Sequence, residues 1–442
     1  MSIIVPTYVH TACSKLNEGG FQAYVVGGAI RDSLLGLQPL DWDVATNASP
    51  EQIEDLFSQT LPTGKQFGTV TVLINDQTLE ITTMRLDGPY GDSRHPNQVF
   101  FTDDLKTDLG RRDFTINAMA YEPLTERLID PFHGSKHLRK GLLTTVGDPS
   151  LRFQEDPLRM LRLLRFQATL GFKVEKKTRL AMQARWIRSV SPERIQTELS
   201  KMLLGKELSP ALQLFYDSSL MEEIIPELAA GAGVSPGERH PYDLLGHSIM
   251  SAHFVYPSPP LRWAALLHDV GKLQSPLRDH EQIGAQIAQQ ILMRLRCSSK
   301  LIHEVETLIA NHMFEIHPHS SDKAIRRFMA RVGKNTAYQL VKLRQGDMAG
   351  MNTDPRLIVD YGHAMVARFK DILEQNDALS LRDLSLNGQN LMNALQLQPG
   401  PLVGELLQHL LEQVLIDPQL NQEDRLLDLA RDYLKSKPEK TP

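Results

Sequence analysis

The sequence changes from strand-type to helix-type patterns near residue 150, and this change limits the folds that the chain can adopt. Residues 1–145 contain short β-branched stretches such as 70–74 and 79–82, separated by glycine or Asn-Asp turns, which predicts a mixed α/β region. From about residue 155 leucines recur at helical spacing and strand signals become scarce. We therefore predict an α/β head with a mixed sheet, followed by an all-α neck, body and tail.

Composition excludes several classes of protein. The 41% apolar and 23% charged residues are typical of a globular chain, no apolar run approaches the roughly 18 residues of a membrane span, and the N-terminus lacks a signal-peptide pattern. Cys13 and Cys297 are too few and too distant in sequence for a disulfide scaffold. We therefore expect a cytoplasmic protein with no membrane partner.

The net charge of −5 conceals a basic segment. Residues 139–206 hold 15 lysines and arginines but 6 aspartates and glutamates, which is a local charge of +9 and leaves −14 for the rest of the chain. Because local potential attracts phosphates, the segment indicates an anionic partner. Within it Arg194 and Glu198, spaced i,i+4, predict a structural salt bridge.

A glycine turn precedes two closely spaced aspartates in the head. Gly27-Gly28 follows a predicted strand and begins a helix, and such turns let a backbone approach a phosphate. Asp41 and Asp43 come next, and residues i and i+2 of a strand point to the same side. Paired carboxylates beside such a turn suit Mg²⁺, and two ions there could activate a hydroxyl and stabilise a leaving phosphate.

Further polar residues accompany this pair. Glu80 lies in an apolar stretch, where it is either a third catalytic carboxylate near the metals or a side chain facing water on an edge strand. Arg111 and Arg112 are adjacent, and because a guanidinium binds phosphate through two hydrogen bonds, the pair suits a triphosphate. The alternative is a surface helix capped by Asp113, which would not explain the presence of Asn117.

Arginines recur at every third position of the helix expected after residue 155. Arg159, Arg162 and Arg165 form a ridge beside a parallel ridge of leucines, so one ridge can pack inward while the other lines a cleft. Asp156 adds an acceptor to these donors, and together they could read a base edge. The alternative is a helix cap at Asp156 with a solvated arginine face.

Five motifs occur in an order that resembles one known arrangement. They are Gly-Gly-x-x-Arg-Asp at 27–32, Asp-x-Asp at 41–43, Arg-Arg-Asp-Phe-Thr-x-Asn-Ala at 111–118, Glu-Asp-x-x-Arg at 155–159 and Glu-Arg-x-x-x-Glu at 193–198. Over residues 20–205 the chain resembles the class II tRNA nucleotidyltransferases and bacterial poly(A) polymerases. The resemblance implies a polymerase-β-like head that adds nucleotides to an RNA 3′ end without a template, with tRNA, CTP and ATP as partners.

The resemblance also implies roles for individual residues. Asp41 and Asp43 would hold Mg²⁺, and Asp156 and Arg159 would pair with the base of CTP or ATP. The nucleotide-binding candidates also include Gly27, Gly28, Arg31, Arg111, Arg112, Asn117, Arg162 and Arg165.

The product of the reaction is less constrained. The loop at 86–96 resembles one that full CCA-adding enzymes keep and CC-only enzymes shorten, which favours complete CCA addition. A-only addition and poly(A) synthesis remain alternatives. A third hypothesis is an RNA-binding phosphohydrolase with an inactive head, against which the intact Asp41 and Asp43 speak.

Histidines are concentrated in the second half of the chain, where nine of the 15 lie between residues 240 and 319. Their pattern resembles the HD phosphohydrolase domain that some of these nucleotidyltransferases carry. Mixed imidazole and carboxylate ligands suit Mn²⁺, Ni²⁺, Co²⁺ or Fe²⁺, and such an ion could supply hydroxide to a phosphoester. The matching metal ligands are His247, His268, Asp269 and Asp347, with His280 and His312 at optional second-metal or phosphate positions.

These observations predict four domains. They are a nucleotidyltransferase head at 1–145, a helical neck and RNA- or nucleotide-binding domain at 146–235, an HD-type domain at 236–370 and a helical tail at 371–442. The sequence leaves open whether the protein is a monomer or a homodimer.

Overall fold

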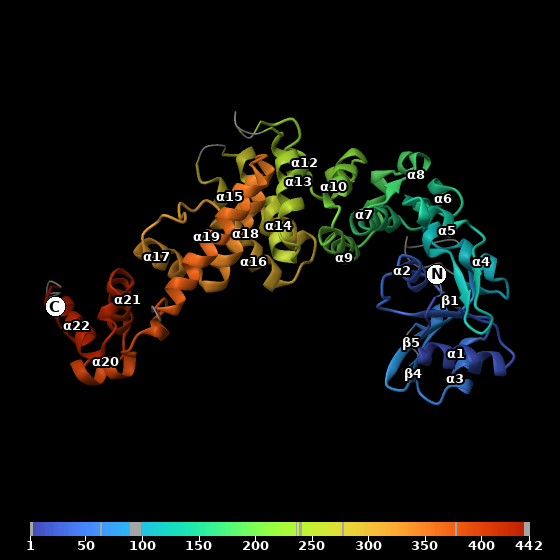
Figure 1. Ribbon diagram of the computed structural model, residues 1–442, viewed down its shortest axis with the longest axis horizontal. Coiled ribbons are helices and arrows are strands. Elements are labelled where there is room, and N and C mark those ends of the chain that lie inside the picture. The colour runs from blue at the N-terminus through green and yellow to red at the C-terminus, as the bar shows by residue number, and fades with distance from the viewer. Residues whose placement is uncertain are drawn as a thin grey trace. The chain divides into compact units, whose positions relative to one another are not determined.

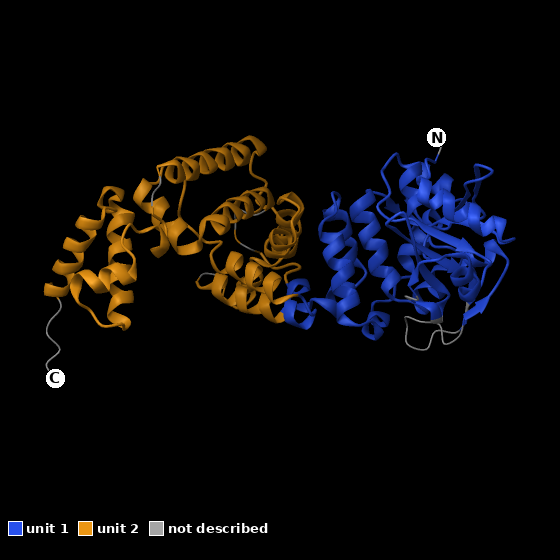
Figure 2. Ribbon diagram, turned by 90° about the horizontal axis from the view of Figure 1, so that it is seen from below, with its two compact units in different colours: residues 1–230, 291–297 blue, residues 231–290, 298–442 orange. Residues whose placement is uncertain are grey.

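The computed structural model divides the chain into two compact units, which Figure 2 shows in different colours. Unit 1 comprises residues 1–230 and 291–297, and unit 2 comprises residues 231–290 and 298–442. Residues 89–96 of the predicted loop at 86–96 lie outside the described residues. The structure describes residues 3–61, 64–88, 99–235, 237, 241–275, 278–375 and 378–436.

The head in unit 1 is built on a mixed seven-stranded sheet of order β3-β4-β5-β2-β1-β8-β9 (Figure 1). Neighbouring strands are antiparallel, except for β2 and β5, which are parallel. Two small sheets, β6–β7 and β10–β11, accompany it. The strands are β1 (Ala23–Val26), β2 (Asp43–Thr46), β3 (Thr60–Leu61), β4 (Thr69–Ile74), β5 (Gln77–Thr83), β6 (Arg85–Asp87), β7 (Val99–Phe101), β8 (Ala120–Glu122), β9 (Arg127–Ile129), β10 (Leu142–Leu143) and β11 (Lys173–Val174).

The interior strand β1 is buried on both faces, and its successive side chains point to opposite sides of the sheet. Val25 packs into one core with residues of α1, α2 and α3, whereas Val26 packs into a second core on the other face. Val26 is also paired with Asp43, so the end of β1 and the start of β2 lie at the same end of the sheet. The helices of the head are α1 (Thr7–Glu18), α2 (Gly28–Leu34), α3 (Pro50–Leu56), η1 (Lys65–Phe67), α4 (Leu105–Gly110), η2 (Thr115–Asn117) and α5 (Gly134–Arg139).

Helices make up most of the remainder of unit 1. The leucine ridge of α7 is buried at Leu158, Leu161 and Leu164, as its spacing predicted, and α7 packs against α9 and α10. The arginine ridge of α7 (Arg159, Arg162 and Arg165) lines a cavity, which is described below. The helices are α6 (Pro149–Glu155), α7 (Leu158–Leu170), α8 (Lys176–Leu180), η3 (Ala184–Ser189), α9 (Pro192–Leu203), α10 (Leu208–Asp217), α11 (Leu220–Ile224) and α12 (Pro226–Ala229).

Unit 2 is helical throughout its described residues. Its centre is α13, which packs against α14 and α18. The last turn of α15 and the residues that follow it belong to unit 1. The helices are α13 (Leu244–Phe254), α14 (Pro259–Leu267), η4 (Val270–Leu273), α15 (His280–Arg294), α16 (Ser299–Ala310), α17 (Asp322–Val332), α18 (Lys334–Gly350), α19 (Pro355–Glu374), η5 (Leu381–Asp383), α20 (Gly388–Leu395), α21 (Pro401–Ile416), η6 (Pro418–Leu420) and α22 (Glu423–Ser436).

The predicted fold class, an α/β head followed by helices, is confirmed. The four domain boundaries stay a prediction. Within the described residues, no helix has both the length and the apolar character that crossing a membrane requires.

Candidate active site and metal centre

The chain turns sharply between β1 and α2, and residue 27 must be glycine for this turn. Gly27 has φ +80°, a conformation that residues with a side chain rarely adopt. A Cβ at this position would lie 3.1 Å from Arg112 Nη1 and 3.6 Å from Asp43 Oδ2. The turn therefore brings bare backbone, a guanidinium and a carboxylate together at one end of the sheet.

Three carboxylates gather beside this turn. Asp43 begins β2, Asp41 precedes the strand by two residues, and Glu80 of β5 is paired with Asp43 in register. Burial raises the pKa of Asp43, and the negative charges of Glu80 and Asp41 raise it further, whereas Arg112 lowers it. This accumulation of negative charge favours a bound cation.

The position of Glu80 corrects one sequence interpretation. Its strand β5 lies between β4 and β2, so it is not an edge strand. The side chain of Glu80 is nevertheless exposed, on the same side of the sheet as its neighbour Asp43.

A chain of hydrogen bonds links the head to the arginine ridge of α7. Arg31 Nη1 donates to Asn117 Oδ1 at 2.7 Å, and Asn117 Nδ2 donates to Asp113 Oδ1 at 3.0 Å. Arg162 donates from Nε and Nη2 to Asp113 Oδ2 at 2.8 and 2.6 Å. Asp113 is thus the junction between head and neck, a role that its interpretation as a helix cap missed.

The adjacent arginines share a buried carboxylate. Asp108 lies 2.9 Å from Arg111 Nη2 and 3.5 Å from Arg112 Nη2, and it is 1% exposed. Burial raises the pKa of Asp108, but the charges of Arg111 and Arg112 outweigh it, so that the pKa is lowered. The carboxylate of Asp108 therefore holds both guanidiniums in place.

The two residues expected to read the base are also held in place. Asp156 Oδ2 accepts from Arg194 Nη2 at 3.0 Å, and Asp156 Oδ1 accepts from the Leu158 amide at 3.1 Å. Arg159 Nη1 donates to Glu155 at 2.7 Å, and its Nη2 donates to the Arg111 carbonyl. One oxygen of Asp156 therefore accepts from the first amide of α7, and its second oxygen is fixed by a partner from α9.

The predicted salt bridge between Arg194 and Glu198 is wrong in its pairing. Arg194 binds Asp156, and Glu198 lies 3.1 Å from Arg165 Nε and 3.9 Å from Arg162 Nη1. Helix α7 packs against α9, so charged side chains at and before the start of α7 and along it lie close to Arg194 and Glu198 of α9. These side chains pair with Arg194 and Glu198 in place of the i,i+4 pair within α9.

These residues surround a cavity of about 720 Å³ in unit 1. Eight cationic side chains and three carboxylates line it, which suits a polyanion. Asp41 and Glu80 do not line the cavity, whereas every other site residue predicted in the head and neck does. The lining residues that sequence reasoning did not assign to nucleotide binding are Asp113, Leu158, Phe166, Thr169, Arg194, Lys201 and Leu204.

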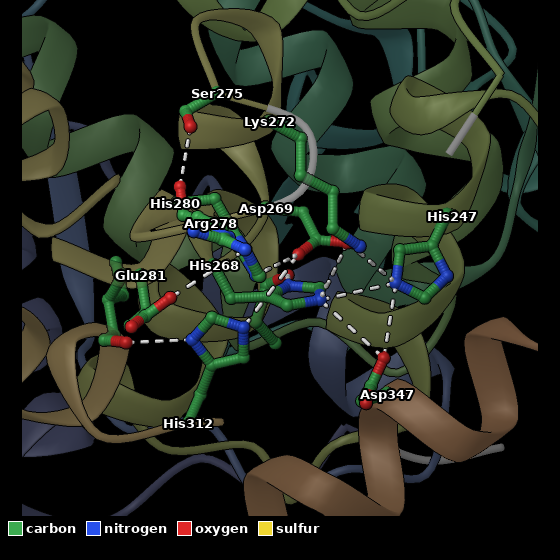
Figure 3. A network of polar contacts seen from close by, with 12 residues as sticks. His247, His268, Asp269, Lys272, Ser275, Arg278, His280, Glu281, His312 and Asp347 are labelled. Carbon is green, nitrogen blue, oxygen red and sulfur yellow. Dashed lines mark hydrogen bonds and ion pairs between the residues drawn. The ribbon is translucent and has the colours of Figure 1, made fainter. Parts of the chain in front are cut away.

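The histidine-rich region of unit 2 forms a second polar cluster, which Figure 3 shows. His247 of α13 is fully buried, and its Nε2 lies 3.2 Å from His268 Nε2 and 3.2 Å from Asp347 Oδ1 of α18. The three ligand atoms lie within 4.8 Å of one another. The close approach of α18 depends on Gly350, where a Cβ would lie 2.8 Å from His247 Nδ1.

A second set of three ligands lies beside the first. Asp269 Oδ1 is 3.7 Å from His280 Nε2 and 3.8 Å from His312 Nε2, which is too far for a hydrogen bond but fits two ligands of one ion. Both nitrogens are buried without a hydrogen-bond partner among the described residues. Asp269 Oδ2 lies 3.4 Å from both His247 Nε2 and His268 Nε2, so this carboxylate adjoins both sets.

The protonation states of this cluster suit metal binding. Burial lowers the pKa of His312 to about 3 and also lowers the pKa of His280, which leaves both rings neutral. Burial raises the pKa of Asp269, but the neighbouring His268 and Lys272 outweigh it and lower the pKa to about 2. All six predicted residues therefore meet, as Figure 3 shows, with ligand-type groups turned toward one another.

The fold and the head site define a class of protein. A mixed sheet that holds a glycine turn beside carboxylates, next to a cavity lined with arginines, belongs to a nucleotidyltransferase. Three family models agree with this class: "Poly A polymerase head domain" matches residues 23–144, "Probable RNA and SrmB- binding site of polymerase A" matches 171–231, and "tRNA nucleotidyltransferase domain 2 putative" matches 277–430.

Similarity to curated proteins identifies the family. The chain is 31% identical over 432 residues to the CCA-adding enzyme of Leuconostoc mesenteroides, with 95% of each chain covered. It is 34% identical over 419 residues to that of Bacillus subtilis, covering 93% of this chain and 94% of the relative. The chain therefore belongs to the CCA-adding enzyme family, whose nucleotidyl transfer is metal-dependent.

Solved structures have the same fold. The crystal structure of the Bacillus stearothermophilus CCA-adding enzyme in complex with CTP matches with a TM-score of 0.76 and 26% identity, over 98% of this chain and 99% of that chain. The Thermotoga maritima CCA-adding enzyme complexed with tRNA matches with a TM-score of 0.58 at 19% identity, over 98% of this chain and 97% of that chain.

Proposed function

We propose that this chain adds cytidine, cytidine and adenosine to the 3′ end of tRNA, using CTP and ATP and releasing pyrophosphate. The observation that carries the proposal is the arginine-lined cavity, which adjoins Asp43 and is also lined by Asp156 and Arg159. The RNA 3′ oxygen would form a bond to the α-phosphorus while the bond to the pyrophosphate oxygen breaks.

Mg²⁺ is the ion that suits the head. Asp41 and Asp43 would hold it with Glu80 nearby; burial, and then the charges of Glu80 and Asp41, raise the pKa of Asp43, and a bound cation would offset both effects. When bound, such ions lower the pKa of the attacking hydroxyl and stabilise charge on the leaving phosphate.

The chain's own residues would bind and orient the triphosphate. The bare backbone at Gly27 allows close approach of a phosphate, and Arg112 lies beside it. Arg111 and Arg112 are fixed by the buried Asp108, so little side-chain entropy is lost when they bind. Arg31 extends this cationic surface from α2.

Asp156 and Arg159 would select the base. Cytosine and adenine each present an exocyclic amino donor beside a ring-nitrogen acceptor, so a fixed carboxylate and a fixed guanidinium fit both. Arg194 and Glu155 hold these two side chains in place before a nucleotide binds. A base with the reverse pattern would place donor against donor and acceptor against acceptor, so it would lose its hydrogen bonds to both side chains.

The test is nucleotide incorporation into tRNAs that lack CCA, end in CC, or carry complete CCA. With Mg²⁺, CTP and ATP, we expect extension that stops once CCA is complete. Unlimited adenosine tailing would replace the proposal with poly(A) synthesis, and extension of the CC-ending tRNA alone would indicate an A-only enzyme. If no nucleotide is incorporated into any of these tRNAs, the head is inactive as a transferase.

A second function is favoured by the two ligand sets that meet at Asp269. We propose that unit 2 hydrolyses a phosphoester with Mn²⁺, Ni²⁺, Co²⁺ or Fe²⁺ held by these residues. Orphaned, buried and neutral nitrogens on His280 and His312 support the fit of such an ion. Hydrolysis of bis(p-nitrophenyl) phosphate or p-nitrophenyl phosphate with each metal tests it, and no hydrolysis with any of them would refute it.

A further inference from the structure

One aromatic ring in the cavity wall lies among three arginines. Phe166 of α7 is 5% exposed and lines the cavity. Its ring centroid is 5.1 Å from the guanidinium carbon of Arg31, 5.7 Å from that of Arg162 and 4.4 Å from that of Arg165. All three guanidiniums also line the cavity. Phe166 is therefore the shared neighbour of three cationic side chains that line the cavity.

The three guanidiniums come from two parts of unit 1. Arg31 lies on α2 in the head, whereas the other two lie on α7, and Phe166 also contacts Phe114 of the head edge to face at 5.7 Å. Each guanidinium is balanced by a carboxylate. The pairs are Arg31–Asp32 at 2.8 Å, Arg162–Asp113 at 2.6 Å and Arg165–Glu198 at 3.1 Å.

This arrangement has a physical consequence for the positions of the arginines. Three positive groups repel one another, and each is also attracted by its own carboxylate. The electron-rich faces of an aromatic ring attract guanidiniums by about 0.5 to 2 kcal/mol each, depending on their burial. The three guanidinium carbons lie 4.4 to 5.7 Å from the centroid of this one ring, so the ring of Phe166 attracts all three side chains toward the same place.

We propose that Phe166 is a positioning residue that gathers Arg31, Arg162 and Arg165 toward the cavity and so sets the affinity for the triphosphate of both CTP and ATP. The proposal rests on the nucleotide-binding role of the cavity. In this proposal Phe166 acts on the phosphates through the three arginines, whereas selection of the base is assigned to Asp156 and Arg159.

The test compares Phe166→Leu, which keeps an apolar side chain without a π-system, with Phe166→Trp, which keeps the π-system at a larger volume. Calorimetric titration of CTP and ATP without RNA measures Kd, and incorporation kinetics then separate KM from kcat. For the leucine variant we expect Kd and KM to rise roughly tenfold for both nucleotides, with kcat within about twofold. The tryptophan variant should stay within about threefold of the wild type.

Phe215→Leu is the matched control. Phe215 is a buried phenylalanine of α10, 1% exposed, and its ring has no guanidinium contact within the described part of the chain. This variant should lose thermal stability and keep Kd. If Phe166→Leu does not fold, Phe166→Met takes its place.

The inference would be overturned if Phe166→Leu bound both nucleotides as tightly as the wild type, or if Phe166→Leu and Phe166→Trp weakened binding equally. A shift for only one nucleotide would also overturn it. Because Kd is measured without RNA, the two proposals can fail separately. A chain that binds triphosphates but extends no tRNA would refute the proposed transfer activity and leave the inference about Phe166 standing.

Discussion

Replacing Asp113 by asparagine should loosen the connection between head and neck. The carboxylate is 7% exposed and accepts from Arg162 twice, at 2.8 and 2.6 Å, and from Asn117 at 3.0 Å. Asparagine keeps the shape but removes the charge that balances Arg162. The nearest other carboxylate to that guanidinium, on Glu198, is 3.9 Å away and also serves Arg165.

The magnitude can be worked in two ways. Breaking a buried ion pair costs about 3–5 kcal/mol, and because the Arg162 side chain is 33% exposed, screening reduces this to about 2–3 kcal/mol. Burial raises the pKa of Asp113, but Arg162 and Asn117 outweigh it and lower the pKa to about 2. Against an unfolded value of about 3.9, this shift corresponds to about 2–3 kcal/mol.

Thermal unfolding followed by circular dichroism is the first assay. For a unit of this size, the loss lowers Tm by roughly 4–12 °C. Because the folded pKa is depressed, the stabilisation is present above the unfolded pKa and is lost as the pH falls through about 2. The urea midpoints of the wild type and of Asp113→Asn should therefore differ by the same amount at every pH between 5 and 8. This difference should shrink below about pH 4.

Glu223→Gln provides the control for a surface pair. Glu223 receives two hydrogen bonds from Arg188, at 2.7 and 2.8 Å, but the Arg188 side chain is 72% exposed, so this variant should change Tm little. The reasoning is refuted if Asp113→Asn costs no more than Glu223→Gln. A difference from wild type that persists unchanged near pH 2.5 would refute it equally.

Three further outcomes follow from the two sites. Asp156→Ala should blur the choice between CTP and ATP more than it weakens triphosphate binding, as ratios of kcat/KM would show; an unchanged preference counts against base reading. Arg194→Ala should produce a weaker form of the same effect, because Arg194 bonds Asp156 at 3.0 Å; a wild-type ratio in that variant would mean that Asp156 needs no such support. Asp41→Ala should abolish transfer and spare hydrolysis, His268→Ala should do the converse, and loss of both activities from either folded variant contradicts two independent sites.

Features with a local cause could be predicted from the sequence. The leucine ridge of α7 is buried because helical spacing places Leu158, Leu161 and Leu164 on one face. The turn at Gly27 was predictable because only glycine adopts its φ without strain. The six residues of the candidate metal centre come from five separate places in the sequence, because only His268 and Asp269 are adjacent, yet the resemblance to a known domain was enough to group them.

Features with a tertiary cause could not be predicted in this way. Asp113 and Arg162 are 49 residues apart, and Asp156 and Arg194 are 38 apart, so no periodicity connects them. The i,i+4 rule pairs Arg194 with Glu198, but it describes an isolated helix. Once α7 lies against α9, closer partners are available, and only the packing of the helices determines which pair forms.

The central claim is that the carboxylates beside the glycine turn bind the divalent ions that drive extension of RNA. The most direct measurement is single-turnover addition of one CMP to tRNA lacking CCA, at increasing Mg²⁺, in the wild type and in Asp43→Asn. We predict Mg²⁺-dependent addition that this substitution slows by roughly 10³-fold or more, while His268→Asn leaves it within about twofold. Addition by Asp43→Asn at close to the wild-type rate, or addition that is indifferent to Mg²⁺, would contradict the account.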